Sequence, residues 1–453
     1  MEFAGKRALI VGAGKSGIAA FNLLYDAKAN PVIFDSNTNL DIAKTASKTK
    51  AGDKTEIIVG NLSEEEWKSY DFAVLSPGVP VMEGIGAEVA AHGLYILGEI
   101  ELGYELSKGR LIAITGTNGK TTTTALTGKI CEDYYGKCFV VGNIGNPYTC
   151  EALNTEDDSV TVAEISSFQL ETIHAFHPEI SAILNITPDH LNRHKTMENY
   201  VKVKEDICLN QTKNDFCVLN YEDEYLKEFG PKCSANVMYF SSARKVDFGC
   251  FLKDEDIYFI KDGEEKRLMN IYEMKLLGTH NVENVMAAIC MCYAAGIPFD
   301  NIIASVKEFT AVEHRIEYVC TKKGVDYYND SKGTNPDAAI KGIQAMNRPT
   351  VLIGGGYDKG NTYDEWIEAF NGKVKAFVLL GQTADAIEEC ARKHGLTEIY
   401  RASSLEETVR ICAGLAKEGD AVLLSPACAS WGMFENYEVR GRMFKDLCRA
   451  LED

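Results

Sequence analysis

The sequence predicts an α/β protein of three domains. Its 453 residues exceed the ~100–200 residues that one domain usually holds. Short apolar runs typical of buried strands recur along it, each followed by a turn and a helix-like stretch, and this cycle begins at three places. Hydrophobic residues make up 45% and charged residues 25% of the chain, which leaves enough apolar surface for several cores. We expect domains at residues 1–98, 99–311 and 312–453.

The first domain is predicted to be Rossmann-like. The stretch RALIVGAGKSGIAAFNLLYDAKANPVIFDS has the pattern of a strand, a glycine turn, a helix and a second strand that ends at Asp35. Gly12, Gly14 and Gly17 could admit a pyrophosphate, with Asp35 near a ribose hydroxyl, or could simply allow close packing of the helix on the strand. The spacing does not distinguish NAD from another nucleotide diphosphate.

The second domain is predicted to bind a nucleoside triphosphate. The stretch AITGTNGKTTTT brings a strand and a glycine turn to the start of a helix, where backbone N–H groups attract phosphate. Lys120 would neutralise phosphate oxygens, and Thr121 would bind Mg²⁺. Ile114 stands where the pattern G-x-x-x-x-G-K-[ST] has its first glycine, which indicates a variant P-loop. We expect a P-loop ATPase-type domain with a mostly parallel sheet.

Other polar residues of this domain follow predicted strands. Glu164 ends the strand VTVAE and is expected to bind Mg²⁺ at the carboxyl edge of the sheet, unless it is only a solvated strand end. NITPDHLNRH places Asn185, Asp189, His190 and His194 after another buried strand. The two histidines lack the glutamate of H-E-x-x-H, which argues against zinc hydrolysis. A polar hairpin is expected in FLKDEDIYFIKDGEEKRLM, followed by a buried helix in NVENVMAAICMCYAAGI.

The third domain is predicted to be Rossmann-like as well. RPTVLIGG, VKAFVLLG and DAVLLSPACAS are three short buried strands, each followed by turn residues and a helix. Charged residues in the turns of this region include Arg315, Asp330, Lys332 and Lys359. Such residues are often solvated surface, but their position at strand ends favours a ligand cleft.

Charge and composition restrict the partners. A formal net charge of −19 argues against binding of nucleic acid or an anionic membrane. There is no signal-peptide pattern and no run of ~18 apolar residues, so we expect a cytoplasmic protein without membrane insertion. Fourteen cysteines occur without a C-x-x-C pair, and we interpret them as reduced thiols rather than zinc ligands or disulfides.

The motifs together resemble the Mur ligase family over essentially the whole chain. The segments that match the family, in its order and spacing, are GTNGKTT, GNIGNP, EISSFQLE, NITPDHLNRH, LLGTHNVENVMAA, HRIEY, NDSKGTNPD, GGGYDKG and LLSPACASWGMFENYEVRGRMF. The resemblance implies a UDP-binding first domain, an ATP-binding second domain and an amino-acid-binding third domain. It also implies ATP-dependent amide ligation of D-glutamate to UDP-N-acetylmuramoyl-L-alanine through an acyl phosphate, in peptidoglycan precursor synthesis. We expect the chain to act as a monomer.

The same resemblance assigns residues to each ligand. The UDP-substrate set is Lys15, Ser16, Asp35, Ser36, Asn37, Gly78, Asn143, Ser166 and His190. The ATP set is Gly116, Thr117, Asn118, Gly119, Lys120, Thr121, Thr122, Asn281, Arg315 and Asp330. The D-glutamate set is Lys332, Thr334, Lys359, Ser430 and Tyr437. The Mg²⁺ set is Thr121, Glu164, His190 and Lys204, and the catalytic set is Lys120, Asn143, His190 and Lys204.

Two positions leave open questions. The resemblance implies that Lys204 is carbamylated, but an ordinary cation at this position, or at Lys202 instead, is the alternative. Tyr437 departs from the family pattern, which usually has Phe there.

Two other functions are alternatives to the ligase. An NAD-dependent dehydrogenase would explain only the first ~100 residues, about one domain. A nucleotide-binding switch would leave the lysines of the third domain without a role.

Overall fold

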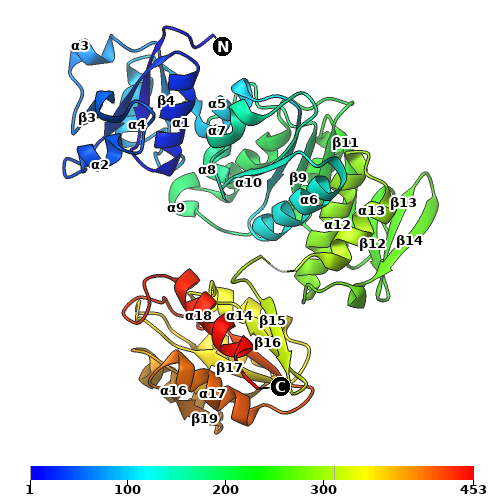
Figure 1. Cartoon of the computed structure of the whole chain (residues 1–453). Helices are drawn as coiled ribbons and strands as arrows, with labels where there is room; N and C mark the ends of the chain where they lie inside the picture. Colours follow the sequence, from blue (N-terminus) through cyan, green and yellow to red (C-terminus); the bar gives the residue numbers. More distant parts are fainter. Residues whose placement is uncertain (1, 144, 311, 453) are drawn as a thin grey trace. The chain divides into compact units, whose positions relative to one another are not determined.

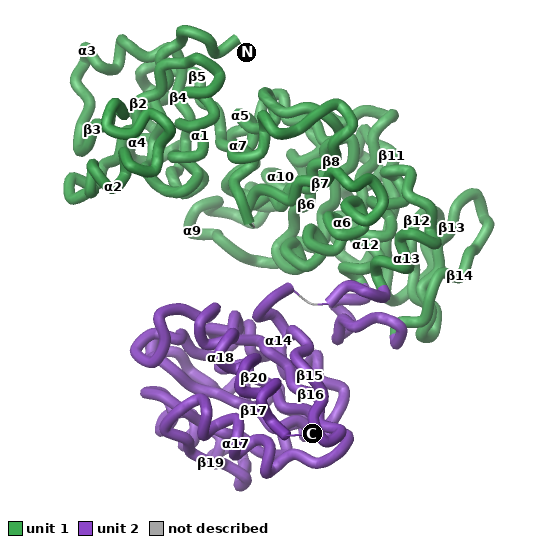
Figure 2. Tube along the Cα trace, viewed as in Figure 1, with its two compact units in different colours: residues 1–271, 283–306 green, residues 272–282, 307–453 purple. Residues whose placement is uncertain are grey.

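The computed structural model describes residues 2–143, 145–310 and 312–452, and its strands form three separate sheets of five, nine and six strands (Figure 1). Most neighbouring strands are parallel, which confirms the α/β prediction. The chain divides into two compact units, residues 1–271 with 283–306 and residues 272–282 with 307–453 (Figure 2). The first unit contains the first two sheets. The expected domain limits stay a prediction, and residue 311 lies outside the described residues.

The first sheet is entirely parallel, in the order β3-β2-β1-β4-β5. Its strands are β1 (Arg7–Val11), β2 (Asn30–Asp35), β3 (Ile57–Val59), β4 (Phe72–Leu75) and β5 (Tyr95–Gly98). Its helices are α1 (Lys15–Asp26), α2 (Ile42–Ala46), α3 (Glu64–Trp67) and α4 (Gly84–Ala91), with a short 3₁₀ helix η1 (Gly52–Lys54). Ile10 and Val11 belong to different apolar layers, one on each face of the sheet. Burial on both faces explains the continuous apolar runs.

The second sheet has the order β14-β13-β12-β11-β10-β9-β6-β8-β7. Its strands are β6 (Arg110–Thr115), β7 (Cys138–Gly142), β8 (Val160–Glu164), β9 (Ile180–Ile183), β10 (Phe216–Asn220), β11 (Asn236–Ser241), β12 (Gly249–Lys253), β13 (Asp256–Lys261) and β14 (Glu264–Asn270). Strands β12, β13 and β14 pair antiparallel, which confirms the expected hairpin. The edge strand β14 exposes the consecutive charged residues Glu264, Glu265, Lys266 and Arg267.

The helices of this part of the chain fill the connections between its strands. They are α5 (Glu99–Leu106), α6 (Lys120–Tyr135), α7 (Tyr148–Glu151), α8 (Ser167–Leu170), α9 (Leu191–His194), α10 (Met197–Glu205), α11 (Glu224–Phe229), α12 (Thr279–Ala294) and α13 (Phe299–Glu308). Four 3₁₀ helices accompany them: η2 (Ala152–Asn154), η3 (Asp206–Cys208), η4 (Gly230–Lys232) and η5 (Ile271–Glu273). Helix α12 is the expected buried helix, and Gly296 follows it with a left-handed φ of 89°.

Helix α5, which follows the first sheet directly, is anchored by two buried carboxylates. Glu101 accepts hydrogen bonds from the backbone N–H groups of His174, Ala175 and Phe176. Glu99 accepts two from Thr149, through its backbone N–H and its hydroxyl, each at 2.8 Å. These bonds fix α5 to helix α7 and to the segment that follows α8.

The third sheet has the order β15-β16-β20-β17-β18-β19 and is parallel apart from the pair β15–β16. Its strands are β15 (Glu317–Lys322), β16 (Val325–Asn329), β17 (Thr350–Gly354), β18 (Val374–Leu379), β19 (Ile399–Arg401) and β20 (Ala421–Leu424). Its helices are α14 (Pro336–Ala345), α15 (Asp364–Glu368), α16 (Ala384–Lys393), α17 (Leu405–Leu415) and α18 (Tyr437–Arg449). Strands β17, β18 and β20 are the three predicted ones. β15 and β19 are only partly buried, and β16 contains Asp326 and Asn329, so their sequences carry a weaker apolar signal.

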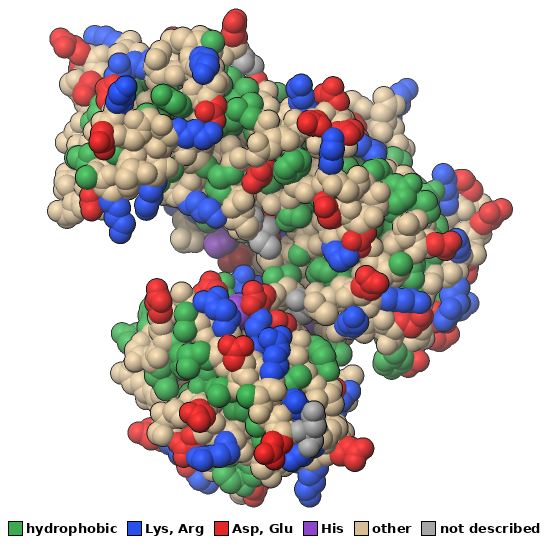
Figure 3. Space-filling view, in the orientation of Figure 1, with side chains coloured by type: hydrophobic (Ala, Val, Ile, Leu, Met, Phe, Trp, Pro, Cys, Tyr) green, Lys and Arg blue, Asp and Glu red, His purple; other side chains and the backbone are tan. Residues whose placement is uncertain are grey.

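The surface carries both signs of charge. Acidic and basic side chains are interspersed over the face drawn in Figure 3, although acidic residues predominate in the composition. Among the residues that the structure describes, no helix has the length and apolar character needed to cross a bilayer.

Candidate active site

The P-loop of the second sheet joins β6 to α6. Strand β6 lies between β9 and β8, and the turn after it contains Gly116 with a φ of 149° and Gly119 with a φ of 84°. A Cβ atom at Gly119 would lie 2.3 Å from Oδ1 of Asn284, so a side chain would not fit there. The ammonium of Lys120 donates to the carbonyl oxygens of Gly116 at 2.8 Å and Thr117 at 2.9 Å. The turn therefore has the geometry of a phosphate-binding loop at a helix start.

Neighbouring loops brace this turn. The Oδ1 atom of Asn185 accepts from the backbone N–H of Asn118 at 2.8 Å, and its Nδ2 atom donates to the carbonyl of Asn118 at 3.1 Å. The Thr117 hydroxyl hydrogen-bonds with the Tyr200 hydroxyl at 3.0 Å. It also accepts from the backbone N–H of Thr187 at 3.0 Å. The loop after β9 and helix α10 thus hold the P-loop backbone in place.

Glu164 ends β8 at the same edge of the sheet as the P-loop. Its Oε1 atom accepts from the side-chain amide of Asn143 at 2.7 Å, while its buried Oε2 atom has no hydrogen-bond partner. Asn143 also donates its backbone N–H to the carbonyl of Glu164 at 2.8 Å. A buried carboxylate oxygen without a donor is a costly arrangement in isolation, and it fits a carboxylate that binds a cation. Glu164 is therefore not a solvated strand end.

Lys204 lies on the buried side of α10. It exposes 1% of its surface, and its ammonium donates to the carbonyl of Gly116 at 2.9 Å. The ring of Tyr200 lies 4.9 Å from the nitrogen. Burial, and then the nearby charge of Lys120, lower the pKa of Lys204 to about 7, although Asp189 opposes the shift. Two lysines thus converge on one carbonyl oxygen, and the buried one loses its proton easily.

Lys202, the alternative to Lys204, lies on the opposite side of α10. Its side chain is 74% exposed and pairs with Asp206 at 3.4 Å. The structure therefore separates the two lysines by burial, and it places only Lys204 beside the P-loop.

The two histidines of NITPDHLNRH have different surroundings. His190 has a left-handed φ of 51°, a 49% exposed side chain, and Nε2 3.5 Å from a carboxylate oxygen of Asp189. His194 is buried, hydrogen-bonds with the Ser167 hydroxyl at 2.9 Å, and has its pKa lowered by burial. His190 thus remains accessible to a ligand, whereas His194 is part of the packing.

The glycine turn of the first sheet follows β1, on either side of which β2 and β4 lie. This is the switch point at which parallel sheets commonly bind ligands. Gly12 has a φ of 103°, and a Cβ at Gly17 would lie 1.8 Å from the carbonyl oxygen of Gly12. Asp35 accepts from the backbone N–H groups of Ala13 and Asn37, each at 2.9 Å. Its carboxylate therefore shapes the turn itself.

The other residues of the UDP set lie near turns of the same unit. Lys15 donates to the carbonyl of Gly145 at 2.6 Å, which links α1 to the loop after β7. Ser166 caps α8 by accepting from the backbone N–H of Gln169 at 3.3 Å. Ser36 and Gly78 are exposed, and Ser16 is half-buried at the start of α1.

In the second unit, Asp330 follows β16 and is fully buried. It accepts from the Ser425 hydroxyl at 2.7 Å. Burial raises the pKa of Asp330 to about 7, against the opposing effects of the Ser425 hydrogen bond and the charge of Arg315. Asn281, also assigned to ATP, is buried near the start of α12 and donates to the carbonyl of Leu277 at 2.7 Å.

Arg440 connects two loops of this unit from inside α18. Its buried guanidinium donates to the hydroxyl of Ser331 at 3.0 Å, to the carbonyl of Ser331 at 2.9 Å and to the carbonyl of Cys428 at 3.2 Å. Burial lowers the pKa of Arg440 to about 10. Ser331 directly precedes Lys332, and Cys428 lies two residues before Ser430. Arg440 thus holds together the two loops that carry these assigned residues.

The D-glutamate set lies around these loops. The ammonium of Lys332 is 5.9 Å from the ring centre of Tyr437, and that of Lys359 is 4.9 Å from the ring centre of Trp431. Ser430 is buried, and Thr334 is half-buried. Burial, then a hydrogen bond with Glu438, raise the pKa of Tyr437 to about 12. The tyrosine ring provides the packing surface that Phe would give.

Sequence reasoning gave no role to Asn185, Tyr200 or Arg440. Asn185 was noted because it follows a buried strand, but its contacts with the backbone of Asn118 give it a role that this position alone did not reveal. Tyr200 and Arg440 act through buried contacts with backbone and hydroxyl groups that are distant in the sequence. No local pattern predicts such contacts.

Comparisons with known proteins identify all three parts of the chain. Residues 6–98 match the model of the Mur ligase MurD-like, N-terminal domain, residues 114–292 the Mur ligase middle domain, and residues 314–428 the Mur ligase, glutamate ligase domain. The chain is 57% identical over 452 residues to the UDP-N-acetylmuramoylalanine--D-glutamate ligase of Lachnospira eligens, with 100% of both chains covered. It is 52% identical over 453 residues to the protein of the same name from Lachnoclostridium phytofermentans, again with 100% of both covered.

A solved structure shares the fold at low identity. The UDP-N-acetylmuramate-alanine ligase of Thermotoga maritima has a TM-score of 0.60 and 19% identity, with 98% of this chain and 99% of that one covered. The domain models, the full-length relatives and the P-loop geometry lead to one conclusion: the chain belongs to the Mur ligase family.

Proposed function

We propose that this chain joins D-glutamate to UDP-N-acetylmuramoyl-L-alanine, with hydrolysis of ATP to ADP and phosphate. The full-length relatives that carry the name of this activity support the substrate assignment. The observation that carries the chemistry is the convergence of Lys120 and Lys204 on the carbonyl of Gly116, at the sheet edge where Glu164 ends β8. Because its substrates are ATP and a nucleotide-linked precursor, we place the activity in the cytoplasm, and we propose a monomer.

The reaction needs an activated carboxylate, because oxide is too poor a leaving group for direct attack by an amine. A carboxylate oxygen of the alanyl group takes the γ-phosphoryl group of ATP, which gives an acyl phosphate and ADP. The amine of D-glutamate then adds to the acyl carbon, and the tetrahedral intermediate expels phosphate and loses a proton.

The first step brings like charges together. Two unit charges 4 Å apart interact by ~4 kcal/mol at an effective dielectric constant near 20. The ammonium of Lys120 and the backbone N–H groups at the start of α6 oppose this repulsion. Lys120 already donates to two carbonyls of the P-loop, so its position is fixed before the phosphates bind.

The residues around the P-loop fit Mg²⁺. Magnesium prefers oxygen ligands, and the buried Oε2 atom of Glu164 has no hydrogen-bond donor. Thr121, Glu164, His190 and a carbamylated Lys204 would hold the metal. When bound, Mg²⁺ supplies positive charge that stabilises the phosphate oxygens. Asn143 orients the Glu164 carboxylate through its side-chain amide.

Carbamylation of Lys204 is supported by its burial. The neutral amine adds to CO₂ and releases one proton, which leaves a carbamate anion on Nζ. A pKa lowered to about 7 leaves a large neutral fraction at neutral pH. The carbamate would also replace a cation beside Lys120 with an anion, which removes the repulsion between the two lysines.

The remaining ligand sites follow the assigned residues. We propose that Lys332, Lys359 and Ser430 bind the carboxylates of D-glutamate, with Thr334 and Tyr437 adjacent. The glycine turn after β1, with Lys15 and Asn37, would hold the UDP group. Arg440 would position the D-glutamate loops without contacting the ligand.

A coupled assay of ADP release tests this proposal. The chain is incubated with ATP, Mg²⁺, UDP-N-acetylmuramoyl-L-alanine and one amino acid at a time. We expect release of ADP with D-glutamate, and little with L-glutamate, L-lysine or diaminopimelate. Equal rates with these amino acids would contradict the substrate assignment. Hydride transfer to a nicotinamide, or ATP binding without D-glutamate-dependent ADP release, would contradict the ligase activity itself.

A further inference from the structure

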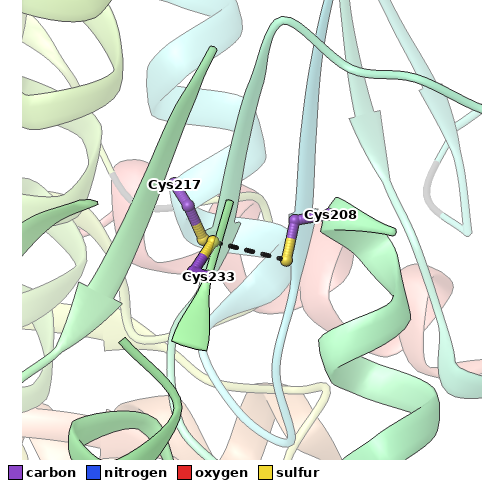
Figure 4. A group of neighbouring side chains, drawn as sticks. All are labelled: Cys208, Cys217 and Cys233. Carbon is purple, nitrogen blue, oxygen red and sulfur yellow. Dashed lines mark hydrogen bonds between the residues drawn. The ribbon is translucent and has the colours of Figure 1, made fainter. Parts of the chain in front are cut away.

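Three cysteines that come from separate segments of the chain lie close together near the C-terminal end of helix α10. Cys208 ends η3, Cys217 lies in β10, and Cys233 follows η4. Their sulfur atoms all lie within 4.8 Å of one another, and those of Cys208 and Cys233 are 3.9 Å apart. Figure 4 shows the three side chains grouped together, with a dashed line between the sulfur atoms of Cys233 and Cys208. The spacing of these residues along the chain gives no metal-binding pattern, so only the fold reveals the cluster.

The separation of the sulfur atoms matches a metal site. A Zn–S bond of ~2.3 Å in a tetrahedral site places neighbouring sulfur atoms ~3.8 Å apart. The observed 3.9 Å between Cys208 and Cys233 is close to this value. A disulfide would use only two of the three sulfur atoms. Three converging sulfur donors are instead the ligand set that soft metal ions prefer.

The surroundings restrict the type of ion. Cys208 and Cys217 are buried within the apolar core that includes Ile207, Leu219 and Ala235, and Cys233 is half-buried at its margin. An apolar pocket with three sulfur donors excludes the hard ions Mg²⁺ and Ca²⁺, which need oxygen ligands. Partial exposure of Cys233 gives an ion a path of entry, and the proposed site would take a water molecule as its fourth ligand.

The thiols already interact with one another. The Cys233 thiol donates to the sulfur atom of Cys208 at 3.9 Å. Binding of a cation displaces the thiol protons. The Cys208 thiol also contacts the carbonyl of Glu205, the last residue of α10, at 3.0 Å.

We propose that Cys208, Cys217 and Cys233 form a binding site for one thiophilic metal ion of the Zn²⁺ class. The site is separate from the Mg²⁺ ligands proposed above and draws on none of them. Bound metal would tie η3 to β10 and to the end of η4. Because η3 continues directly from α10, the metal would also stiffen the end of the helix that carries Lys204, four residues before Cys208.

Cobalt titration of the full chain tests the site. The chain is reduced, freed of metal under anaerobic conditions, and titrated with Co²⁺ in the presence of excess Mg²⁺, which occupies oxygen sites. We expect a sulfur-to-cobalt charge-transfer absorption that saturates at one ion per chain and disappears when Zn²⁺ is added. Cys233→Ser should weaken Co²⁺ binding by at least ~10-fold, as loss of a ligand does. The matched variant Cys320→Ser, another half-buried cysteine outside the cluster, should bind as the unmodified chain does.

A second measurement needs no variant. One equivalent of Zn²⁺ should slow alkylation of Cys233 by iodoacetamide, as read by peptide mass spectrometry, and should leave alkylation of the exposed Cys150 unchanged. Absence of a sulfur charge-transfer band, equal Co²⁺ affinity in Cys233→Ser, or unchanged alkylation of Cys233 would each overturn the proposal. So would formation of a Cys208–Cys233 disulfide that persists in the presence of Zn²⁺.

Discussion

At the scale of single residues, burial lowers the pKa of Lys204, whereas Lys202, two residues away on the same helix, is exposed. We predict that Lys204→Ala lowers turnover at least ~10²-fold, as loss of a preorganised charged group does. Short-chain carboxylic acids should partly restore the activity, since their carboxylate can occupy the place of the carbamate. Lys202→Ala is the control, because Lys202 is exposed and paired with Asp206. Rescue by amines instead of acids, or an unmodified ammonium in a crystal structure with Mg²⁺ and substrates, would refute the carbamate.

Asp330 should make stability depend on pH. Its pKa is raised from 3.8 to about 7 by burial, so the folded chain keeps it protonated between these values while the unfolded chain ionises it. Its contribution to stability is therefore complete below pH 3.8 and is lost as the pH rises through 7. Asp330→Asn stays neutral, and we expect it to gain up to ~4 kcal/mol over the unmodified chain by pH 8.

Thermal unfolding at pH 5 and pH 8 measures this effect. The advantage of Asp330→Asn should be larger at pH 8, and Asp337→Asn, an exposed residue of α14, should show no such trend. An equal advantage at both pH values would show that ionisation of Asp330 does not control stability.

The candidate site residues could be predicted from the sequence where a motif places them at a strand end or at the start of a helix after a glycine turn. Lys120 and Thr121 begin helix α6 after the glycine turn, Glu164 ends β8, and Asp35 ends β2, each as expected. Their surroundings could not be predicted. That Asp35 accepts from the backbone N–H of Ala13, 22 residues away, or that Lys204 shares the carbonyl of Gly116, 88 residues away, depends on contacts between distant segments.

At the scale of elements, helix α18 organises the loops assigned to D-glutamate through Arg440. We predict that Arg440→Met raises the KM for D-glutamate more than the KM for ATP, because the loops at Ser331 and Cys428 lose their common donor. Each buried carbonyl left without a donor costs ~1–3 kcal/mol, so the variant should also unfold at a lower temperature.

Arg442→Met is the matched control for this variant. Arg442 lies on the same helix but is exposed, and its replacement should leave both KM values and the unfolding temperature unchanged. An equal rise in the two KM values of Arg440→Met would indicate general loosening of the unit rather than positioning of the D-glutamate loops.

Elements were predicted most reliably where strands are buried on both faces. β6, β17 and β20 are continuous apolar runs, and each was expected. The pair β15–β16 was not expected, because β15 has only one buried position, Val319, and therefore lacks a strand-like apolar pattern. The sheet orders were not predicted either, since strand neighbours are set by packing between distant segments.

At the scale of the whole molecule, two compact units with separate cores predict unfolding in more than one step. Leu219→Ala removes a fully buried side chain from the core of the second sheet and should cost ~2–5 kcal/mol. Calorimetry should show that it lowers one transition, whereas Arg440→Met lowers another. A single transition shifted by both variants would show that the units unfold together.

Strand β14 has a consequence for how copies of this chain meet one another. An edge strand presents unpaired backbone groups that can pair with the edge of a second molecule, and this is a common start of aggregation. The edge of the nine-stranded sheet instead carries four charged residues in succession, of which two are acidic and two basic. A second β14 could join this edge only by burying some of these charges. The β14 edge of this sheet can therefore stay unpaired at high protein concentrations, and the sheet does not extend through it from one molecule into the next.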